Sequence, residues 1–599
     1  MIRIRSLFFT LCCSTLPVVS CISFISSAHA ADNALVPEAA SNSTEFAVNQ
    51  NASAQKFMAV TANQHATDAA VKMLKRGGSA IDAMIAAQLV LGLVEPQASG
   101  IGGGAFALYW DQRAQKLHYF DARETAPKNV DENYFLLSNG EPQPFLDAVI
   151  GGKSVGTPGA VKLLATTHKR FGKLPWKDLF QPAIALAENG FAISPRLHTQ
   201  LEETPRLFES TALRAYFFDG DQPKPVGARL KNPAYAKTLR LLAKEGEAAF
   251  YRGALARNIV DAVQRDPNQQ GPLALADLAA YAIKERDPLC MDYREYTLCG
   301  AAPPSSGATT VFAILGMLQR FPVDARPANS VEFAHLFAEA SRLAFADRDT
   351  YLADPDFVTV PAAGLVAPEY LAARAQLIDP LRAAATVSAG EPAWPTKAAA
   401  QNYLTAPSPE RAGTSQISIV DNDGNALSMT TTIESAFGSR IFVDGFFLNN
   451  QLTDFSFTPR NAAGKQVANR IEPGKRPRSS MAPTIVFRHG KPVLLIGSPG
   501  GARIIDFVAK ALAYRLDSEL PLRESVASAH IISMNRGVEL EQAGNETLKA
   551  ALEARGHSVK ITAQSSGLNA IWIDEKKRNE GKRLTGSSDP RREGAVGGE

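Results

Sequence analysis

The sequence lacks a strong excess of charge of either sign and, beyond its first thirty residues, any long apolar run. Its 599 residues include 63 Lys and Arg and 60 Asp and Glu, a formal net charge of +3 at pH 7. With so small an excess and no dense basic stripe, the composition gives no electrostatic reason to expect nucleic-acid binding. A membrane-spanning helix needs about 18 or more apolar residues. The longest candidate, 81–94, contains Asp82 and Gln88 and is typical of a buried helix, so we expect no membrane span.

Cysteine is also scarce. The chain has five, of which Cys12, Cys13 and Cys21 lie in the first thirty residues. Cys290 and Cys299 remain, in a stretch whose pattern fits two short strands joined by a turn. In an oxidising compartment these two can form a disulfide. Two unpaired thiols are the alternative, because sequence does not give the Cα separation that a disulfide requires.

The first thirty residues have the pattern of a secretory signal peptide. Arg3 and Arg5 precede an apolar stretch that ends in Ala28-His29-Ala30, a cleavage site of the A-x-A type. We therefore expect residues 1–30 to be removed and the protein to be exported, to the periplasm or into the medium. Lipidation at Cys21 is the alternative, and the apolar residues that continue past it argue against that modification.

Metal-binding patterns in the sequence are incomplete. His335 and Glu339 would share a helical face, but a pair of this kind is more often a polar contact than a set of ligands. A calcium loop needs a glycine and a closing glutamate, which are missing around Asp347, Asp349, Asp354 and Asp356. We assign no metal and no cofactor.

The rest of the chain mixes amphipathic helices with alternating strands. Residues 65–75 predict a helix that ends at Gly77-Gly78, and Ser79 with Asp82 resembles a capping box for the next helix, to about residue 93. Residues 162–350 are mainly helical in pattern. Strands packed face to face with helices outside suit this mixture, so we expect an α/β (α+β) fold.

A glycine-rich stretch, 99–104, superficially resembles a dinucleotide-binding loop. It follows a helix rather than a strand, which argues against that function. We expect its glycines to let the backbone approach a site closely.

Two alternating runs flank Asn422-Asp423-Gly424, which is typical of a β-hairpin with a three-residue loop. In that register Thr432 lies opposite Thr414. One face then carries apolar residues that can be buried: Ile417, Ile419, Leu427 and Met429. The other face carries a row of small polar residues that no hydrophobic core requires: Thr414, Gln416, Ser418, Ser428, Thr430 and Thr432. We expect a functional site on this polar face.

Thr414 directly follows Gly413 and is the candidate nucleophile. A threonine hydroxyl needs a base, and the residue's own α-amine can serve once the residue is a chain start. The α-amine has a pKa of about 7.7 to 8.0, so no histidine is needed, and none lies near Thr414. The bond between Gly413 and Thr414 must then be cut, by attack of the Thr414 hydroxyl on the Gly413 carbonyl. Gly413 has no Cβ, so a strained peptide would carry little steric cost there.

Motifs along the chain, from about Asn63 to Glu593, resemble those of the γ-glutamyltranspeptidase (glutathione hydrolase) family in the family's order. They are VEPQASGIGGGAF (94–106), DARETAP (121–127), GGKSVGTPGAV (151–161), PPSSGA (303–308), HLFAEASRLAFADRD (335–349), LNNQLTDFS (448–456), KRPRSSMAPTIV (475–486), GSPGGARII (497–505) and DPRREGA (589–595). Each motif alone is weak. Their number and order make the resemblance specific.

The resemblance implies a four-layer αββα sandwich of the N-terminal nucleophile hydrolase type, built from two chains after self-cleavage. The large subunit would be 31–413 and the small subunit 414–599, and the two would stay together as a heterodimer. Residues 380–413, rich in Ala and Pro, predict a flexible tether before the cleavage site.

The resemblance also assigns roles at the site. Thr414 would be the nucleophile, supported by Thr432, with the backbone amides of Gly500 and Gly501 holding the oxyanion. The substrate α-carboxylate would bind a guanidinium fork and two hydroxyls, and its α-ammonium group a carboxylate and a neighbouring amide. These residues are Arg123, Ser479 and Ser480 for the carboxylate and Asp454 and Gln451 for the ammonium group.

The implied reaction is acyl transfer from glutathione and related γ-glutamyl compounds, through a γ-glutamyl-Thr414 ester, to water or to an amino acid or peptide. Two departures from the family pattern put the substrate in doubt. Glu434 stands where asparagine is expected, and residues 457–473 have no aromatic after Phe457. An acylase for glutaryl or cephalosporin side-chain amides is one alternative, and a non-catalytic exported binding protein is another.

Overall fold

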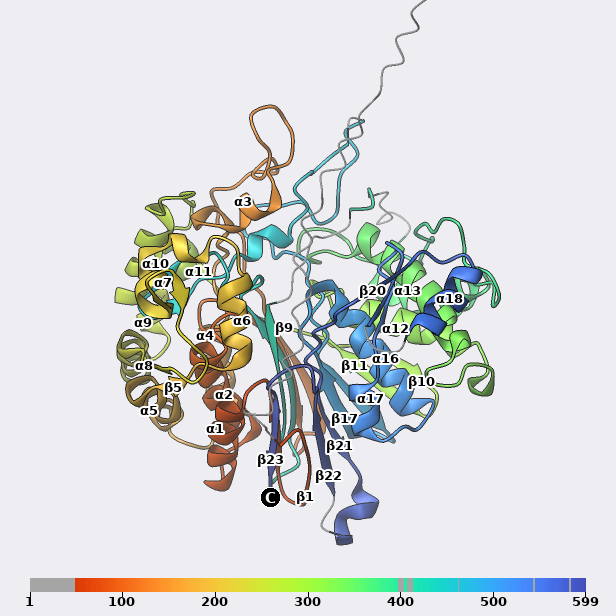
Figure 1. Ribbon diagram of the computed structural model, residues 1–599, viewed down its shortest axis with the longest axis horizontal. Helices are drawn as coiled ribbons and strands as arrows, with labels where there is room; N and C mark the ends of the chain where they lie inside the picture. The colour runs from red at the N-terminus through yellow and green to blue at the C-terminus, as the bar shows by residue number, and fades with distance from the viewer. Residues whose placement is uncertain (1–48, 397–402, 407–412, 462, 542–544, 581–582) are drawn as a thin grey trace, which may run out of the picture. The chain divides into compact units, whose positions relative to one another are not determined.

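Two seven-stranded antiparallel sheets form the centre of the computed structural model, which describes residues 49–396, 403–406, 413–461, 463–541, 545–580 and 583–599 (Figure 1). The strands of the first sheet are, in spatial order, β1 (Asn51–Ala54), β22 (Leu584–Ser588), β21 (Asn569–Ile573), β17 (Lys491–Gly497), β16 (Thr484–Arg488), β11 (Tyr296–Gly300) and β10 (Leu289–Tyr293). Those of the second are β23 (Ala595–Gly598), β2 (Met58–Thr61), β12 (Thr414–Val420), β13 (Ala426–Thr432), β3 (Gly104–Asp111), β4 (Lys116–Ala122) and β9 (Lys284–Arg286). The signal-peptide prediction for 1–30 lies outside the described residues.

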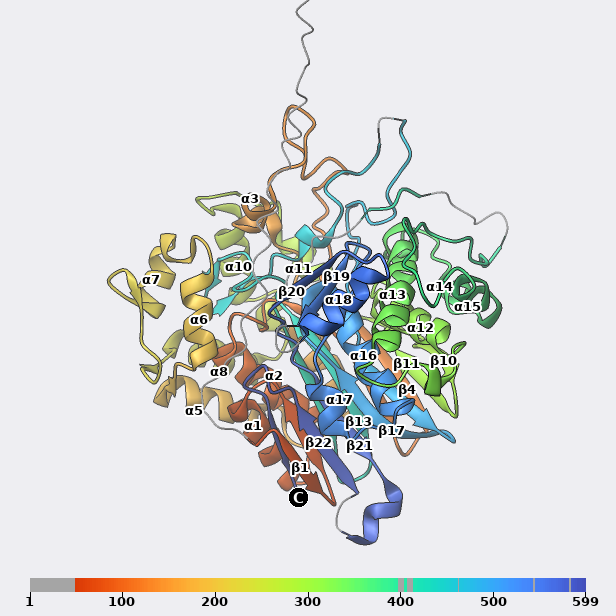
Figure 2. The same cartoon turned by 45° about the vertical axis from the view of Figure 1, so that its right-hand side comes forward.

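Helices cover the outer face of each sheet. Those beside the second sheet are α1 (Gln64–Lys75), α2 (Ala80–Val94), α4 (Ala160–Phe171), α5 (Gln181–Asn189), α6 (Pro195–Glu203), α7 (Thr211–Phe217), α8 (Pro233–Glu245), α9 (Ala248–Tyr251), α10 (Ala254–Gln264) and α11 (Leu275–Ala280). Those beside the first are α12 (Gly307–Leu318), α13 (Val331–Tyr351), α15 (Pro368–Ala375), α16 (Ile504–Leu516), α17 (Leu522–Ala527) and α18 (Glu546–Ala554). Figures 1 and 2 show the resulting order of layers, with both sheets between the two groups of helices. The four-layer prediction is confirmed.

Several short strands lie outside the two large sheets. They form one three-stranded sheet and three strand pairs: β18 (Ile531–Ile532), β19 (Val538–Glu541) and β20 (Val559–Thr562); β5 (Phe191–Ala192) and β8 (Arg229–Leu230); β6 (Phe218–Asp219) and β7 (Gln222–Pro223); β14 (Phe442–Val443) and β15 (Phe446–Phe447).

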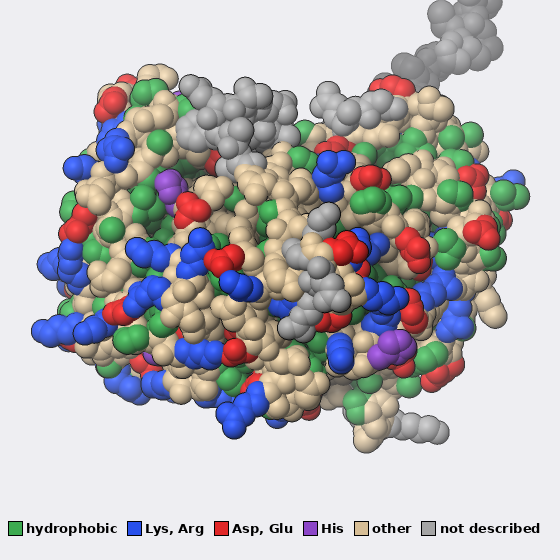
Figure 3. All heavy atoms as spheres, turned by 90° about the horizontal axis from the view of Figure 1, so that it is seen from below, with side chains coloured by type: hydrophobic (Ala, Val, Ile, Leu, Met, Phe, Trp, Pro, Cys, Tyr) green, Lys and Arg blue, Asp and Glu red, His purple; other side chains and the backbone are tan. Residues whose placement is uncertain are grey.

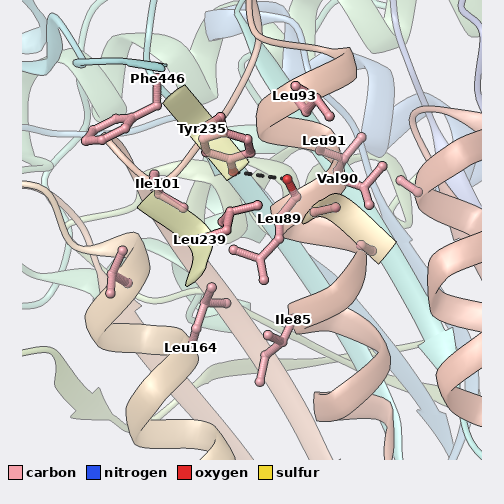
Figure 4. Packing of buried hydrophobic residues seen from close by; sticks show 14 of the residues in the cluster. Ile85, Leu89, Val90, Leu91, Leu93, Ile101, Leu164, Tyr235, Leu239 and Phe446 are labelled. Atoms are coloured by element: carbon pink, nitrogen blue, oxygen red, sulfur yellow. Dashed lines mark hydrogen bonds between the residues drawn. The ribbon is translucent and has the colours of Figure 1, made fainter. Parts of the chain in front are cut away.

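Helix α2 is apolar all round and buried along its whole length. Such a helix belongs inside a large core. Figure 4 shows it there, with Leu89 near Tyr235 and Leu239 of α8, and with the hydroxyl of Tyr235 donating to the Leu89 carbonyl (3.0 Å). The Ser79–Asp82 capping box starts the helix as predicted. Among the described residues no helix is long and apolar enough to cross a membrane.

The hairpin forms in the predicted register. Thr414 pairs with Thr432, and the pairing continues to Val420 opposite Ala426. Gly424 takes a left-handed φ of 85° in the loop. The predicted apolar face packs beneath α2, with Ile417 and Met429 fully buried. Period-two alternation thus fixed both the pairing and the buried face.

The second hairpin predicted, around the two remaining cysteines, is β10 and β11. Cys290 lies directly opposite Cys299, with a Cα–Cα distance of 4.2 Å, and the structure joins them by a disulfide. Directly opposed residues of an antiparallel pair are close enough for this bond.

The face of the molecule in Figure 3 shows Lys and Arg side chains interspersed with Asp and Glu, without a large field of one sign. This distribution agrees with the small net charge of +3. The described residues of this face therefore offer no electrostatic track for a polyanion.

Candidate active site

Thr414 and Thr432 face each other where the hairpin strands β12 and β13 reach the edge of a pocket. The Thr414 hydroxyl donates to Oγ1 of Thr432 (3.1 Å), and the Thr432 hydroxyl donates to the carbonyl oxygen of Gly413 (2.6 Å). The backbone N–H of Glu434 also donates to Oγ1 of Thr432 (2.8 Å), so both lone pairs of this oxygen accept hydrogen bonds. The candidate nucleophile therefore connects, through one hydroxyl, to the carbonyl of the peptide bond that precedes it.

The rest of the polar row on the hairpin does not line the pocket. Four of its members are fully buried between the two sheets: Gln416, Ser418, Ser428 and Thr430. The Ser418 hydroxyl donates to the Asn569 carbonyl in β21 (2.9 Å), and that of Ser428 donates to the Ile496 carbonyl in β17 (3.1 Å). The pocket therefore lies at the Thr414–Thr432 end of the polar face, because the rest of the face binds the opposing sheet.

Backbone contacts around the two threonines explain the glycines nearby. A Cβ on Gly413 would collide with the carbonyl oxygen of Glu434, and a Cβ on Gly103 would collide with that of Thr432. Glu434 itself has a left-handed φ of 78°. The expectation that the 99–104 glycines permit a close backbone approach is confirmed. At Gly413 the same steric reason applies.

A small pocket opens beside Thr414. Its lining includes every residue predicted for catalysis or substrate binding except Gly500, namely Arg123, Thr414, Thr432, Glu434, Gln451, Asp454, Ser479, Ser480 and Gly501. Met481 and Ile504 also line it and were not singled out from the sequence. Met481 follows Ser480, and Ile504 comes three residues after Gly501, each inside a motif that resembles the family. Their positions in these motifs could have identified them as pocket residues.

Arg123 follows directly after β4 and ion-pairs within the pocket. Its Nη2 lies 2.5 Å from Oδ2 of Asp454, which also accepts from the side-chain amide of Gln451 (2.6 Å). Backbone carbonyls of Pro477 (3.1 Å) and Arg478 (2.8 Å) fix the guanidinium. Since buried charges are costly unless they are paired, the cation and the carboxylate neutralise each other here.

Glu124, the residue after Arg123, was missed by the sequence reasoning. It is fully buried, and its Oε2 lies 3.8 Å from Nη1 of Arg123. Burial raises the pKa of Glu124 to about 7, against the opposing effect of the Arg123 charge. Its place inside the DARETAP motif was the signal that could have identified it.

Glu434, predicted as a substrate-binding residue, lies in the pocket lining. Its carboxylate accepts from the Ser435 hydroxyl (2.5 Å) and from the Asn450 side-chain amide. The buried guanidinium of Arg440 is close enough for the two charges to interact, and burial lowers the pKa of Arg440 to about 10. The extra carboxylate therefore has both hydrogen-bond donors and a nearby cation.

Ser479 and Ser480 are held from behind by residues of two other motifs. Ser306 donates to the Ser479 carbonyl from both its backbone N–H (2.6 Å) and its hydroxyl (2.7 Å). Arg348 of α13 donates from Nη2 to Oγ of Ser480 (2.7 Å). Ser306 and Arg348 lie inside PPSSGA (303–308) and HLFAEASRLAFADRD (335–349), and these motifs were the signal that could have identified them.

Gly500 and Gly501 form the turn between β17 and the short 3-10 helix η8 (Gly501–Arg503) that leads into α16. Both have positive φ angles, 138° and 58°. A Cβ on Gly500 would approach the ring of Phe507 to 2.6 Å. Glycine is required here, and only Gly501 of the pair lines the pocket.

A further contact reaches Thr414 from the C-terminal motif. Nη1 of Arg592 donates to the Thr414 carbonyl (3.3 Å), and its Nε donates to the Ser565 carbonyl (2.9 Å). The DPRREGA motif thus holds the backbone of the candidate nucleophile.

The segment expected to differ from the family lid lies against a neighbouring loop. Phe457 stacks on Phe135, with ring centroids 4.4 Å apart, and Nε of Arg460 lies 2.9 Å from Oε1 of Glu132. Backbone pairing joins Val467 to Leu404, which belongs to the predicted tether. The described residues of this segment are therefore attached at several points.

Part of the predicted tether also contacts the body. The N–H of Ala383 donates to the Arg555 carbonyl (2.7 Å), that of Gly390 to the Asp347 carboxylate (2.8 Å), and that of Ala406 to the Asp349 carbonyl (3.0 Å). Residues 397–402 and 407–412 lie outside the described part of the chain. The flexibility of 380–413 stays a prediction.

The candidate metal ligands make other contacts. Within the described ranges no group of three or more His, Cys, Asp or Glu side chains could hold a metal ion. His335 hydrogen-bonds to His557 (2.7 Å) and to the Asp379 carbonyl (2.7 Å). The nearby aspartates pair with arginines instead, for example Asp349 with Arg348 (2.6 Å).

Known proteins resemble the chain over nearly its whole length. The sequence model of the family described as gamma-glutamyltranspeptidase matches residues 66–599. The glutathione hydrolase proenzyme of Bacillus subtilis (strain 168) is 35% identical over 546 residues, which cover 90% of this chain and 91% of the relative. The Acylase ACY 1 proenzyme of Pseudomonas sp. (strain SE83) is 34% identical over 533 residues, 87% of this chain and 90% of the relative. The crystal structure of cephalosporin acylase from Bacillus halodurans superimposes with a TM-score of 0.79 at 25% identity, over 92% of this chain and 97% of that one.

Proposed function

Because the chain belongs to the γ-glutamyltranspeptidase family, we infer that it is a γ-glutamyltransferase and glutathione hydrolase made as a proenzyme. Relatives at about a third identity over most of their length carry the glutathione hydrolase name. The observation that carries the proposal is the hydrogen-bond path from the Thr414 hydroxyl through Thr432 to the Gly413 carbonyl.

Self-cleavage would use that path directly. The Thr414 oxygen attacks the Gly413 carbonyl carbon, and the Thr432 hydroxyl stabilises the negative charge that develops on the carbonyl oxygen. The C–N bond then breaks, the Thr414 nitrogen takes the proton lost by the hydroxyl, and Gly413 is left as an ester on Thr414. Water hydrolyses the ester. The products would be a large subunit of 31–413 and a small subunit of 414–599 that begins with a free threonine amine.

Substrate binding would exploit the ion pair already in the pocket. A γ-glutamyl group carries one carboxylate and one ammonium on the same carbon. Its carboxylate would bind to Arg123, Ser479 and Ser480. Its ammonium group would bind to Asp454 and Gln451. The zwitterion thus replaces the Arg123–Asp454 contact of 2.5 Å with two of its own, without leaving either buried charge unpaired.

Turnover would proceed by acyl transfer. The free amine of Thr414 takes the hydroxyl proton as Oγ1 attacks the γ-carbonyl, and the amides of Gly500 and Gly501 hold the oxyanion. The leaving amine departs with the proton, which gives a γ-glutamyl-Thr414 ester. Water, or an amino acid or peptide amine, then accepts the acyl group. Glutathione is the leading donor.

An acylase for other side-chain amides is the second candidate, because a relative named as an acylase is about as similar as the hydrolases. Glu434 in the pocket lining is the residue that keeps this alternative open. The non-catalytic alternative is not retained, since the family is one of enzymes. For localisation we propose export, most simply to the periplasm, on the signal-peptide pattern of residues 1–30.

The test combines a gel with two chromogenic substrates. We expect the purified protein to run as two bands, with threonine at the N-terminus of the smaller one. It should release p-nitroaniline from γ-glutamyl-p-nitroanilide and leave glutaryl-p-nitroanilide, which lacks the ammonium group, nearly untouched. Preference for the glutaryl compound would favour the acylase, and a break at another bond would contradict the assignment of Thr414.

A further inference from the structure

We propose that Arg348 is a positioning residue that aims the Ser480 hydroxyl into the pocket and so selects substrates with a free α-carboxylate over their neutral α-carboxamides. The inference rests on the proposed function, whose γ-glutamyl substrate it makes more specific. It concerns a residue of α13, which does not itself line the pocket.

The Arg348 guanidinium lies fully buried behind the pocket wall. Its three nitrogens donate in three directions: Nη2 to Oγ of Ser480 (2.7 Å), Nε to Oγ of Ser306 (2.9 Å) and Nη1 to Oδ1 of Asp349 (2.6 Å). A planar fork with five N–H donors and no acceptor can only donate to these oxygens.

That donation settles the direction of the Ser480 proton. A hydroxyl has one hydrogen and two lone pairs, and Arg348 occupies one lone pair of Oγ. Arg348 has no acceptor, so the Ser480 hydrogen cannot point back at it. Ser480 lines the pocket, and its hydrogen is then available to an acceptor there. A carboxylate oxygen is such an acceptor, whereas the NH2 group of a carboxamide offers a second donor.

Ser479, next to Ser480, also has its hydroxyl hydrogen free to point into the pocket, and Ser306 holds its backbone. The Ser479 hydroxyl oxygen accepts from the N–H of Met481 (3.2 Å), so its hydrogen is also free to point away. Ser306, which binds the Ser479 carbonyl, is the second hydroxyl that Arg348 contacts. One guanidinium therefore supports both members of the serine pair.

Asp349 also holds Arg348 in place. Its Oδ1 accepts from Nη1 of Arg348 (2.6 Å) and lies 3.4 Å from Nη2 of Arg478. A charge-assisted contact of this kind helps to fix the plane of the guanidinium and therefore the direction of its donor to Ser480.

The test is a comparison of two substrates on a set of variants. The substrates are γ-glutamyl-p-nitroanilide and its α-carboxamide, which differ only in the charge and donors of the α-substituent. For Arg348→Met we expect kcat/KM on the carboxylate substrate to fall about 10- to 100-fold, mainly through KM, as for the loss of hydrogen bonds to a charged group. On the carboxamide we expect a change of less than about threefold. Ser480→Ala should show the same pattern, and the double variant should be no worse than the poorer single one.

Arg374→Met is the matched control, because Arg374 is buried against α13 through Asp347 (3.2 Å) and lies outside the pocket lining. It should affect both substrates equally. Equal losses on both substrates for Arg348→Met, or additive losses in the double variant, would overturn the proposal. If Arg348→Met does not fold or cleave, Arg348→Lys decides: it keeps the charge without the fork, and it should raise KM for the carboxylate substrate alone. A wild-type protein inactive on γ-glutamyl-p-nitroanilide would instead refute the proposed function.

Discussion

One row of polar side chains on the β12–β13 hairpin has two parts that lie in different surroundings. Thr414 and Thr432 end the row at the pocket, while Gln416, Ser418, Ser428 and Thr430 continue it between the two sheets. All six point to the same face in the same register. What differs is the surface opposite: a pocket wall at one end and the backbone carbonyls of β17 and β21 along the rest. The chemistry of a hydroxyl in this row is set by what it faces.

The hydrogen bonds of the two parts also differ in kind. At the pocket end the path has a direction, from Thr414 through Thr432 to the Gly413 carbonyl. In the sheet interface Gln416 accepts from Thr430 (2.6 Å) and donates to Ser428 (3.0 Å), whose hydroxyl donates in turn to the opposing sheet. The first arrangement places a hydroxyl donor on the carbonyl oxygen of the bond that we propose is cleaved. The second fixes the distance between two sheets.

The largest effect should come from removing the hydroxyl at the open end of the row. Thr414→Ala has no nucleophile, so we expect a single uncut band and an activity at least about 10⁴-fold lower. Ser418→Ala removes a hydroxyl from the same row inside the sheet interface and should still give two bands. A gel of both proteins, with N-terminal sequencing of the small band, makes the measurement. Cleavage of the Thr414→Ala protein at the same bond would refute the role of this hydroxyl.

The next test exchanges one hydroxyl for a methyl group at two neighbouring positions of β13. Thr432→Val removes the donor to the Gly413 carbonyl, so self-cleavage should slow about 10²- to 10³-fold, as for the loss of an oxyanion donor. Thr430→Val makes the same change two residues away and should leave the cleavage rate within a few-fold of the wild type. The rate is read from the decline of the uncut band with time. Equal slowing in both variants would show that packing, rather than the hydroxyl, matters at Thr432.

The sheet interface should respond in stability instead. Gln416→Leu removes the acceptor of the Thr430 hydroxyl and a donor to the Ser428 oxygen, both in fully buried positions. We expect the free energy of unfolding to fall by about 2 to 4 kcal/mol, measured by denaturant titration in the uncut Thr414→Ala background. When Gln416→Leu is the only substitution, the protein should still cleave itself. Gln181→Leu, at an exposed glutamine that starts α5, should change stability by less than about 0.5 kcal/mol.

The sequence was sufficient for the hairpin because its evidence is local. Alternation over 414–432 and the loop around Gly424 determine which residues pair, and they place Thr432 beside Thr414 without knowledge of the rest of the chain. The capping box at Ser79 and the buried character of α2 are local in the same way. The family motifs added the pocket residues, which come from five separate stretches of chain.

The parts that could not be predicted depend on contacts between distant segments. Whether a polar row faces a pocket or a second sheet is decided by β17 and β21, some 70 to 150 residues further along. In the sequence, Arg348 is one charged residue of a predicted helix. Its hydrogen bond to Ser480, 132 positions further along the chain, is visible only in the structure. Glu124 follows Arg123 in sequence, yet only the structure shows that its carboxylate is buried.

The smallest expected effect is on the pH dependence of stability and concerns Glu124. This buried carboxylate beside the pocket accepts no hydrogen bond from any other residue that the structure describes, whereas the polar groups of the sheet interface are hydrogen-bonded. Its pKa is about 7 in the folded protein and about 4.5 when exposed. Below about pH 4.5 the group is protonated in both states, whereas between pH 4.5 and 7 the unfolded chain ionises first. The stability contribution is therefore full at low pH and is lost as the pH rises through 7, by about 1 to 3 kcal/mol.

Glu124→Gln should remove this part of the pH dependence. We expect the fall in unfolding free energy between pH 4.5 and 7.5, measured in the uncut Thr414→Ala background, to be smaller in the variant. Asp506, whose pKa burial also raises to about 7, contributes a slope of the same sign to both proteins, so the difference between them isolates Glu124. Identical slopes would mean that Glu124 ionises in the folded protein near its ordinary pKa, with its charge stabilised by Arg123. The buried group at the pocket edge would then be as well paired as those between the sheets.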